Sequence, residues 1–105
     1  MKKFAFQQSI FLSKNNVKIA PYAQLTFKNA SDNTAASVWS DEDGLDLLDS
    51  NTVLANENGY ILVYLTLGFY NIEIVSGSDT ITLSNVFIGG VSYYEYDTLE
   101  SVIIS

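Results

Sequence analysis

The chain has 105 residues, of which 48% are hydrophobic and 13% aromatic, and its formal net charge at pH 7 is -7. This length supports a single domain with one modest core, and the composition excludes the low hydrophobicity and high charge of disordered chains. The absence of Cys excludes a disulfide framework, and the surplus of acids without any Arg disfavours nucleic-acid binding.

The N-terminal segment carries the positive charge of the chain. All Lys residues lie within the first 28 positions, which contain no acid, and every acid follows Asn29. Solubility, for which surplus acids are effective, is the preferred explanation of this asymmetry. The alternative is that residues 1–20 form a basic arm that docks on an acidic surface, and the segment can also be a first strand over Phe4–Leu12. The predicted partner-binding side chains in this segment are Lys2, Lys3, Phe4 and Phe6. The polar residues that follow do not resemble a secretory signal, and no apolar run is long enough to cross a bilayer, so a soluble, unprocessed protein is expected.

The middle of the chain shows the pattern of short strands separated by turns. Apolar and β-branched residues recur between Asn, Asp, Ser and Gly clusters, and no segment has the sustained spacing of an amphipathic helix. The expected elements are strands over Tyr22–Lys28 and Ala35–Ser40, a turn over Asn29–Thr34, an acidic loop over Asp41–Gly44, and an irregular or weakly extended segment over Leu45–Ala55.

The strongest signal follows in the segment Asn56–Val75. Asn58-Gly59 predicts a tight turn, because Gly tolerates positive φ and Asn visits that region more easily than most residues. Tyr60–Leu65 is a continuous apolar run that predicts a strand. After a turn near Leu67-Gly68, the residues to Val75 alternate between apolar and polar side chains, which predicts a second strand with one buried face.

The C-terminal part is predicted to hold a strand over Thr80–Val86 and then an aromatic strand or arm. Residues 89–105 carry a Tyr cluster that suits a protein interface as well as an ordinary sheet face. The predicted partner-binding residues here are Tyr93, Tyr94 and Tyr96. Taken together, the pattern predicts an all-β chain: one small antiparallel β-sandwich, immunoglobulin-like, with about seven or eight strands, a core over residues 21–88 and extended N- and C-terminal arms.

The acidic loop has two interpretations. Asp41, Asp43 and Asp46 stand around Gly44, and oxygen ligands on a Gly-permitted turn are what Ca²⁺ requires. A helical calcium-binding loop that opens at Asp41 requires a bidentate acid at its twelfth position, which Thr52 occupies in this chain. The sequence therefore does not match that loop. A solvated acidic turn without metal is therefore preferred, with these acids as weak candidates.

Catalysis has little support in this sequence. Because His and Cys are absent, the commonest general base and the strongest nucleophile are missing. Ser or Thr would need another activating group, such as a Lys, and no Lys stands among the acids. Paired carboxylates remain formally possible, and the chain is not expected to be an enzyme or to bind a cofactor. Trp39, the single Trp, is read as a core or rim anchor, with a sugar-stacking platform as the alternative.

Four short motifs stand in a fixed order between residues 22 and 88. They are LTF at Leu25–Phe27, ASVWSD at Ala36–Asp41, ANENGY at Ala55–Tyr60 and LGFYNI at Leu67–Ile72. This order resembles a β-sandwich module of tailed-bacteriophage tail fibres, tailspikes and related virion structural proteins. The chain has Asn56 where that module usually has Asp, and Asn51-Thr52-Val53 where an Asn-Pro often stands.

The resemblance implies a noncatalytic virion protein, most simply a capsid decoration or cement protein or a tail or collar adaptor. Its partners would be other virion proteins, from the capsid, portal or tail, and further copies of itself, with a trimer as one form. Neither nucleic acid nor a membrane is an expected partner, and the chain would reside in the virion after assembly in the bacterial host cytoplasm. The alternative is a carbohydrate-binding or host-adhesion module of a fibre or spike that uses Trp39 and the acidic loop.

Overall fold

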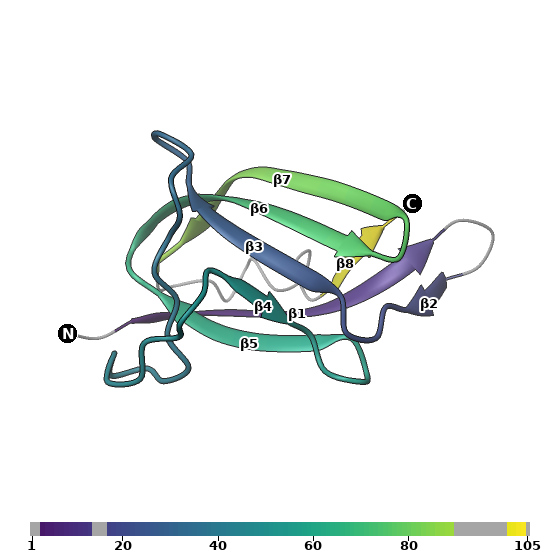
Figure 1. Ribbon diagram of the computed structural model, residues 1–105, viewed down its shortest axis with the longest axis horizontal. Helices are drawn as coiled ribbons and strands as arrows, with labels where there is room; N and C mark the ends of the chain where they lie inside the picture. The colour runs from purple at the N-terminus through teal and green to yellow at the C-terminus, as the bar shows by residue number, and fades with distance from the viewer. Residues whose placement is uncertain (1–2, 14–16, 90–100, 105) are drawn as a thin grey trace.

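The computed structural model describes residues 3–13, 17–89 and 101–104, and these residues form strands and loops without any helix (Figure 1). The predicted all-β class is therefore confirmed. The strands are β1 (Phe4–Ser13), β2 (Val17–Ile19), β3 (Gln24–Asn29), β4 (Thr52–Leu54), β5 (Tyr60–Leu65), β6 (Gly68–Ser76), β7 (Asp79–Ile88) and β8 (Ser101–Ile104).

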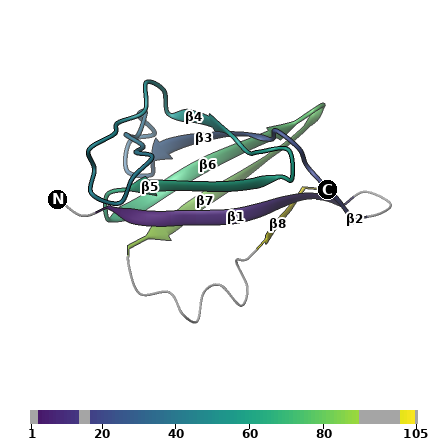
Figure 2. The ribbon, with the colours of Figure 1, turned by 90° about the horizontal axis from the view of Figure 1, so that it is seen from below.

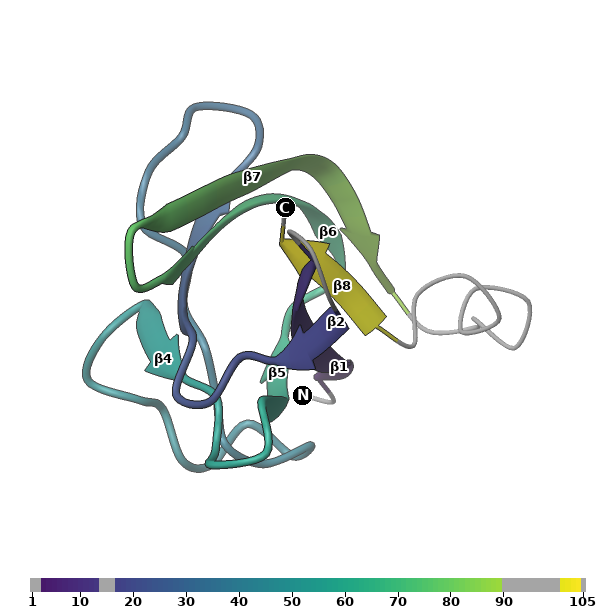
Figure 3. The same cartoon turned by 90° about the vertical axis from the view of Figure 1, so that its right-hand side faces the viewer.

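The strands form two sheets with one core between them. One sheet has the order β4-β3-β6-β7, and the other joins β1 to β2, β5 and β8. Figure 3 shows β6 and β7 arching over β1, β5 and β8, and Figure 2 shows the layer of β1 and β5 in front of β6 and β7. All pairings are antiparallel except that of β1 with β8, which is parallel and departs from the predicted antiparallel arrangement.

β1 organises its whole sheet. Ser9 pairs with both Tyr60 of β5 and Ser101 of β8, and a strand residue has one neighbour on each side, so β5 and β8 lie on opposite edges of β1. Phe11 pairs in the same way with β2 and β8. It follows that β5 and β2 succeed one another along the same edge of β1, while β8 occupies the other edge.

The position of β1 bears on the two alternatives for the N-terminal segment. Of these alternatives, a basic arm or a first strand, the structure has a strand over Phe4–Ser13 that pairs with β5. The core also reaches beyond the predicted range of 21–88, because Phe6, Ile10 and Ala20 are buried in it. For Phe6 and Ile10 the alternation of β1 explains this burial, since every second side chain of a strand points to the same face, whereas Ala20 directly follows β2.

The core is formed by alternate residues of facing strands. Phe6 of β1 meets Phe27 of β3 edge to face, with ring centroids 5.4 Å apart, which is a favoured geometry for aromatic pairs. In β6 the predicted alternation is confirmed, because Tyr70, Ile72 and Ile74 are all buried. The two sheets are thus held together by apolar burial.

The predicted turn at Asn58-Gly59 is confirmed in detail. The side-chain oxygen of Asn56 accepts hydrogen bonds from the backbone N–H groups of Asn58 at 2.8 Å and Tyr60 at 3.0 Å. Gly59 has φ +77°, and a Cβ at this position would lie 2.8 Å from the carbonyl oxygen of Ile10. The turn therefore requires glycine both for its backbone conformation and for its close approach to β1.

Tyr70 anchors the connection between β5 and β6. Its ring is buried, and its hydroxyl donates to the backbone oxygen of Thr66 at 2.7 Å and lies 2.9 Å from the Thr66 hydroxyl. A buried Tyr hydroxyl needs such a partner, so this bond fixes the turn that precedes β6.

The segment between β3 and β4 differs from its prediction. Ala35–Ser40 forms only isolated bridges, because Trp39 exchanges backbone hydrogen bonds of 2.8 Å with Tyr64 and the chain then turns away from β5. The predicted strand over this segment is wrong. The short strand β4 lies instead in the segment that was expected to be irregular or weakly extended.

Candidate functional site

Lys3 faces its own chain. Its side chain is nearly buried, and its Nζ lies 4.2 Å from the ring centroid of Trp39, which is the geometry of a cation–π contact. Its backbone N–H donates to the carbonyl oxygen of Glu42 at 2.7 Å. This predicted partner-binding lysine therefore ties β1 to the acidic loop, while Lys2 lies outside the described residues.

The two predicted N-terminal aromatic contacts also point inward. Phe6 is 6% exposed and belongs to the core, and Phe4 is half-buried and packs against that core. Phe6 is therefore removed from any partner surface, since a buried ring cannot meet another protein without unfolding. Tyr93, Tyr94 and Tyr96 lie outside the described residues, so their role in partner binding stays a prediction.

The acidic loop is organised around backbone hydrogen bonds. The Asp41 carboxylate accepts from the backbone N–H of Leu45 at 3.0 Å and of Asp46 at 2.8 Å. Hydrogen bonding from the backbone, above all from Asp46, lowers the pKa of Asp41 below its usual range. The Ser40 hydroxyl bonds the Asp46 carboxylate in turn. Within the described part of the chain, no three acids are grouped so that they could hold a metal ion, and Asp41, Asp43 and Asp46 are not brought together as a ligand set.

Trp39 does not offer a free ring face on the side of Lys3. A sugar that stacked there would have to displace the lysine ammonium, and the ring is already half-buried. The anchor interpretation of Trp39 fits this environment better than a stacking platform does.

The sequence did not reveal an exposed apolar patch where β6 begins and β7 ends. Leu67, Phe69 and Phe87, which we call the apolar patch, are 61%, 57% and 41% exposed. The Phe69 and Phe87 rings have centroids 5.2 Å apart and are tilted by 50°. Leu67 and Phe87 both lie over Gly89, where a methyl group would be 2.7 Å from Leu67 Cδ1 and 2.3 Å from Phe87 Cζ.

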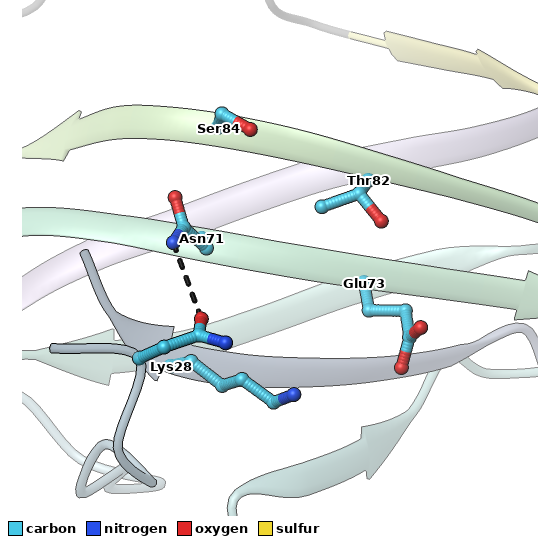
Figure 4. Close-up of a pocket in the computed structure, with 6 residues that line it drawn as sticks. Lys28, Asn71, Glu73, Thr82 and Ser84 are labelled. Carbon is cyan, nitrogen blue, oxygen red and sulfur yellow. Dashed lines mark hydrogen bonds between the residues drawn. The ribbon is translucent and has the colours of Figure 1, made fainter.

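A polar hollow lies beside this patch on the outer face of β3, β6 and β7 (Figure 4). Its volume is about 320 Å³, and it is open to solvent. The lining side chains are Lys28, Asn33, Asn71, Glu73, Thr82 and Ser84. All are polar and include one cation and one anion. The hollow brings together residues from three strands and the loop after β3, and sequence spacing alone did not group them.

A β-bulge in β7 adjoins the hollow. The register of β6 and β7 shifts between Tyr70 and Ile72, so Ser84 and Asn85 both lie opposite Asn71. Asn85 has a left-handed backbone with φ 55°, and its N–H donates to the side-chain oxygen of Asn71 at 3.0 Å. An extra residue of this kind reverses the face to which the following side chains point.

The reversal explains the apolar patch. Before the bulge Ile81 and Leu83 pack against the core, and after it Ile88 is buried. The side chains of β7 that face the core are therefore at odd-numbered positions before the bulge and at even-numbered positions after it. This leaves Phe87 on the outer face, opposite Phe69. Phe69 was detectable in the sequence, because it stands in the polar phase of β6. The exposure of Phe87 was not detectable, because the apolar and polar residues of the β7 segment give no sign of the bulge.

Comparison of the chain with protein-family models, with curated proteins and with solved structures gives no match. The resemblance to a bacteriophage module therefore stays a prediction, and function has to be inferred from the surfaces above. Over the described ranges, no helix has the length and apolar character needed to span a membrane.

Proposed function

We propose that the chain is a noncatalytic, immunoglobulin-like β-sandwich that serves as a structural protein of a bacteriophage particle and binds other virion proteins. The sheet order β4-β3-β6-β7 supports the immunoglobulin-like class, since it corresponds to the C′-C-F-G order of such sandwiches. The Tyr70 hydroxyl bonded to Thr66 corresponds to the tyrosine corner of the same class.

The single observation that carries the binding role is the apolar patch. Scattered exposed apolar residues are ordinary, but two Phe rings in mutual contact beside an exposed Leu form a contiguous surface. Aromatic side chains are enriched in the centres of protein interfaces, where they bury a large area with few rotatable bonds. The patch is therefore the proposed contact with a neighbouring virion protein.

The proposed location is the capsid surface, as a decoration or cement protein, or the tail or collar, as an adaptor. In either place many copies meet a symmetric lattice, so a modest contact at each patch gains strength from repetition. The partners would be capsid, portal or tail proteins and further copies of the chain. No catalytic step is part of this function.

Particle composition tests the proposal. In purified particles of the phage whose genome encodes the chain, quantitative mass spectrometry is expected to find it at a fixed ratio to the major capsid or tail protein. Failure to find it in intact particles would refute the virion assignment.

Occupancy of variants tests the contact itself. Phe69→Ser and Phe87→Ser together are expected to reduce the copies per particle at least about tenfold, because interface aromatics commonly contribute more than about 1.4 kcal/mol each. Leu45→Ser is the matched control, since Leu45 is 85% exposed, directly follows the acidic loop and does not belong to the patch. Equal occupancy of the patch variant and the control would exclude the patch as the contact.

A further inference from the structure

We propose that the polar hollow on the outer face of β3, β6 and β7 binds a neutral saccharide. The proposal does not rest on virion assembly, because the side chains that line the hollow are not those of the apolar patch, although Phe69 of that patch adjoins the hollow. In Figure 4 Lys28, Asn71, Glu73, Thr82 and Ser84 stand on the same side of the sheet and surround one open space. Its volume of about 320 Å³ falls at the lower end of the range for small-molecule sites, about 300–1,000 Å³.

One wall of the hollow is held by hydrogen bonds within the chain. Asn71 accepts from the Asn85 backbone at 3.0 Å and donates through Nδ2 to the side-chain oxygen of Asn33 at 3.3 Å. Asn33 and Asn85 both have left-handed backbones, with φ 63° and 55°. Such outliers persist where the surroundings hold them in place, so one wall of the hollow is preorganised.

The rest of the lining is free to bond a ligand. Within the described part of the chain, the side chains of Lys28, Glu73, Thr82 and Ser84 form no hydrogen bond or ion pair with another residue. Lys28 offers donors, Glu73 offers acceptors, and the two hydroxyls offer both. A ligand that carries several hydroxyl groups can use all of these, since each hydroxyl donates once and accepts twice.

The charges and the neighbouring ring narrow the ligand class. A phosphate would meet the Glu73 carboxylate and an organic cation would meet the Lys28 ammonium, so a neutral ligand avoids both repulsions. An apolar ligand finds no apolar wall. Phe69 lies on the same face of β6, two positions before Asn71 and thus about 7 Å away, and its ring is 57% exposed. It can cover the apolar face of a sugar ring whose hydroxyls reach the hollow.

Chemical-shift mapping on the full chain tests the proposal. Separate titrations use D-glucose, D-galactose, N-acetyl-D-glucosamine and L-rhamnose as probes, with glycine and phosphate as a zwitterion and an anion. We expect at least one sugar to produce saturable shifts of the backbone amides that line the hollow, with a Kd on the order of millimolar. The absence of saturable shifts with all four sugars would overturn the proposal, as would binding of glycine or phosphate in their place.

Paired variants locate the binding. Glu73→Ala and Thr82→Val are each expected to weaken the sugar about tenfold, because each removes a group that bonds it. Thr80→Val is the control, since Thr80 lies on the same strand and face as Thr82 but outside the lining. The melting temperature and circular-dichroism spectrum of each variant are measured first, so that a loss of affinity is not confused with a loss of folding. Unchanged affinity in Thr82→Val and Glu73→Ala, or shifts that centre on Trp39, would refute the assignment to this hollow.

Discussion

The side-chain oxygen of Asn71 accepts a hydrogen bond from the backbone N–H of Asn85 at 3.0 Å, and this bond joins β6 to the bulge in β7. The bulge reverses the phase of β7, so the position of Phe87 on the outer face depends on it. One amide thus supports the polar hollow on one side and determines the composition of the apolar patch on the other.

Asn71→Ala is expected to destabilise the fold by about 0.5–1.5 kcal/mol, because it removes the hydrogen bond from the solvent-exposed Asn85 N–H, which water can then satisfy. Asn71→Asp keeps an acceptor oxygen and should lose much less. Urea unfolding of both variants measures the difference, and equal stability of the two would show that the hydrogen bond is unimportant.

Gly59→Ala should be more damaging than Gly77→Ala, although both glycines have positive φ, +77° and +63°. An alanine at either site carries the left-handed cost of about 1–2 kcal/mol. At Gly59 the new methyl group also meets the Ile10 carbonyl at 2.8 Å, whereas nothing lies within 4 Å at Gly77. We expect a further loss of about 1–3 kcal/mol at Gly59 from this overpacking. Thermal unfolding of Gly59→Ala and Gly77→Ala measures this difference. Similar melting temperatures would contradict the close approach of Gly59 to Ile10.

Tyr70→Phe removes the hydroxyl that bonds Thr66 in the buried turn before β6. The expected loss is about 1–3 kcal/mol, since the Thr66 carbonyl is left without this donor. Tyr22→Phe serves as the control because Tyr22 is 59% exposed. Chemical unfolding that ranks the two variants equally would argue against a tyrosine corner.

Lys3→Met should change the fluorescence of Trp39, which is the single Trp of the chain. Loss of the cation–π contact is expected to cost about 0.5–2 kcal/mol and to alter the emission maximum or yield. Lys28→Met removes the same charge from the other sheet and should leave the emission unchanged. An emission spectrum that is identical in Lys3→Met and in the unmodified chain would show that Lys3 does not sit over the ring.

Acid should weaken the acidic loop through Asp41. Its pKa in the folded chain lies below the ordinary value of 3.8, so the carboxylate contributes stability above that pH and loses it as the pH falls through the folded pKa. We expect the melting temperature of the unmodified chain to fall more steeply below about pH 4 than that of Asp41→Asn. Parallel pH profiles in both forms would contradict the role of Asp41.

The centre of the fold was predictable because its signals are local. The Asn58-Gly59 turn needs a particular backbone, and the alternation of Tyr70, Ile72 and Ile74 follows directly from burial of one face. Both features can be read from a few neighbouring residues, and both are confirmed.

The surfaces were not predictable because they depend on long-range pairing. The charge of Lys3 suggested a free arm, yet its contact with Trp39 exists only after β1 is paired with β5. Phe87 faces outward because of a bulge whose residue Asn85 is hydrogen-bonded to Asn71 of another strand. The neighbouring residues in the sequence indicate neither the contact of Lys3 with Trp39 nor the outward position of Phe87.

The bulge has a further effect, on aggregation. β7 is the outermost strand of its sheet, and a long regular edge of this kind presents a row of amide and carbonyl groups to which another chain can add. The left-handed Asn85 interrupts that row partway along the strand. Copies that are crowded together at high local concentration are thereby discouraged from fusing edge to edge into a continuous sheet.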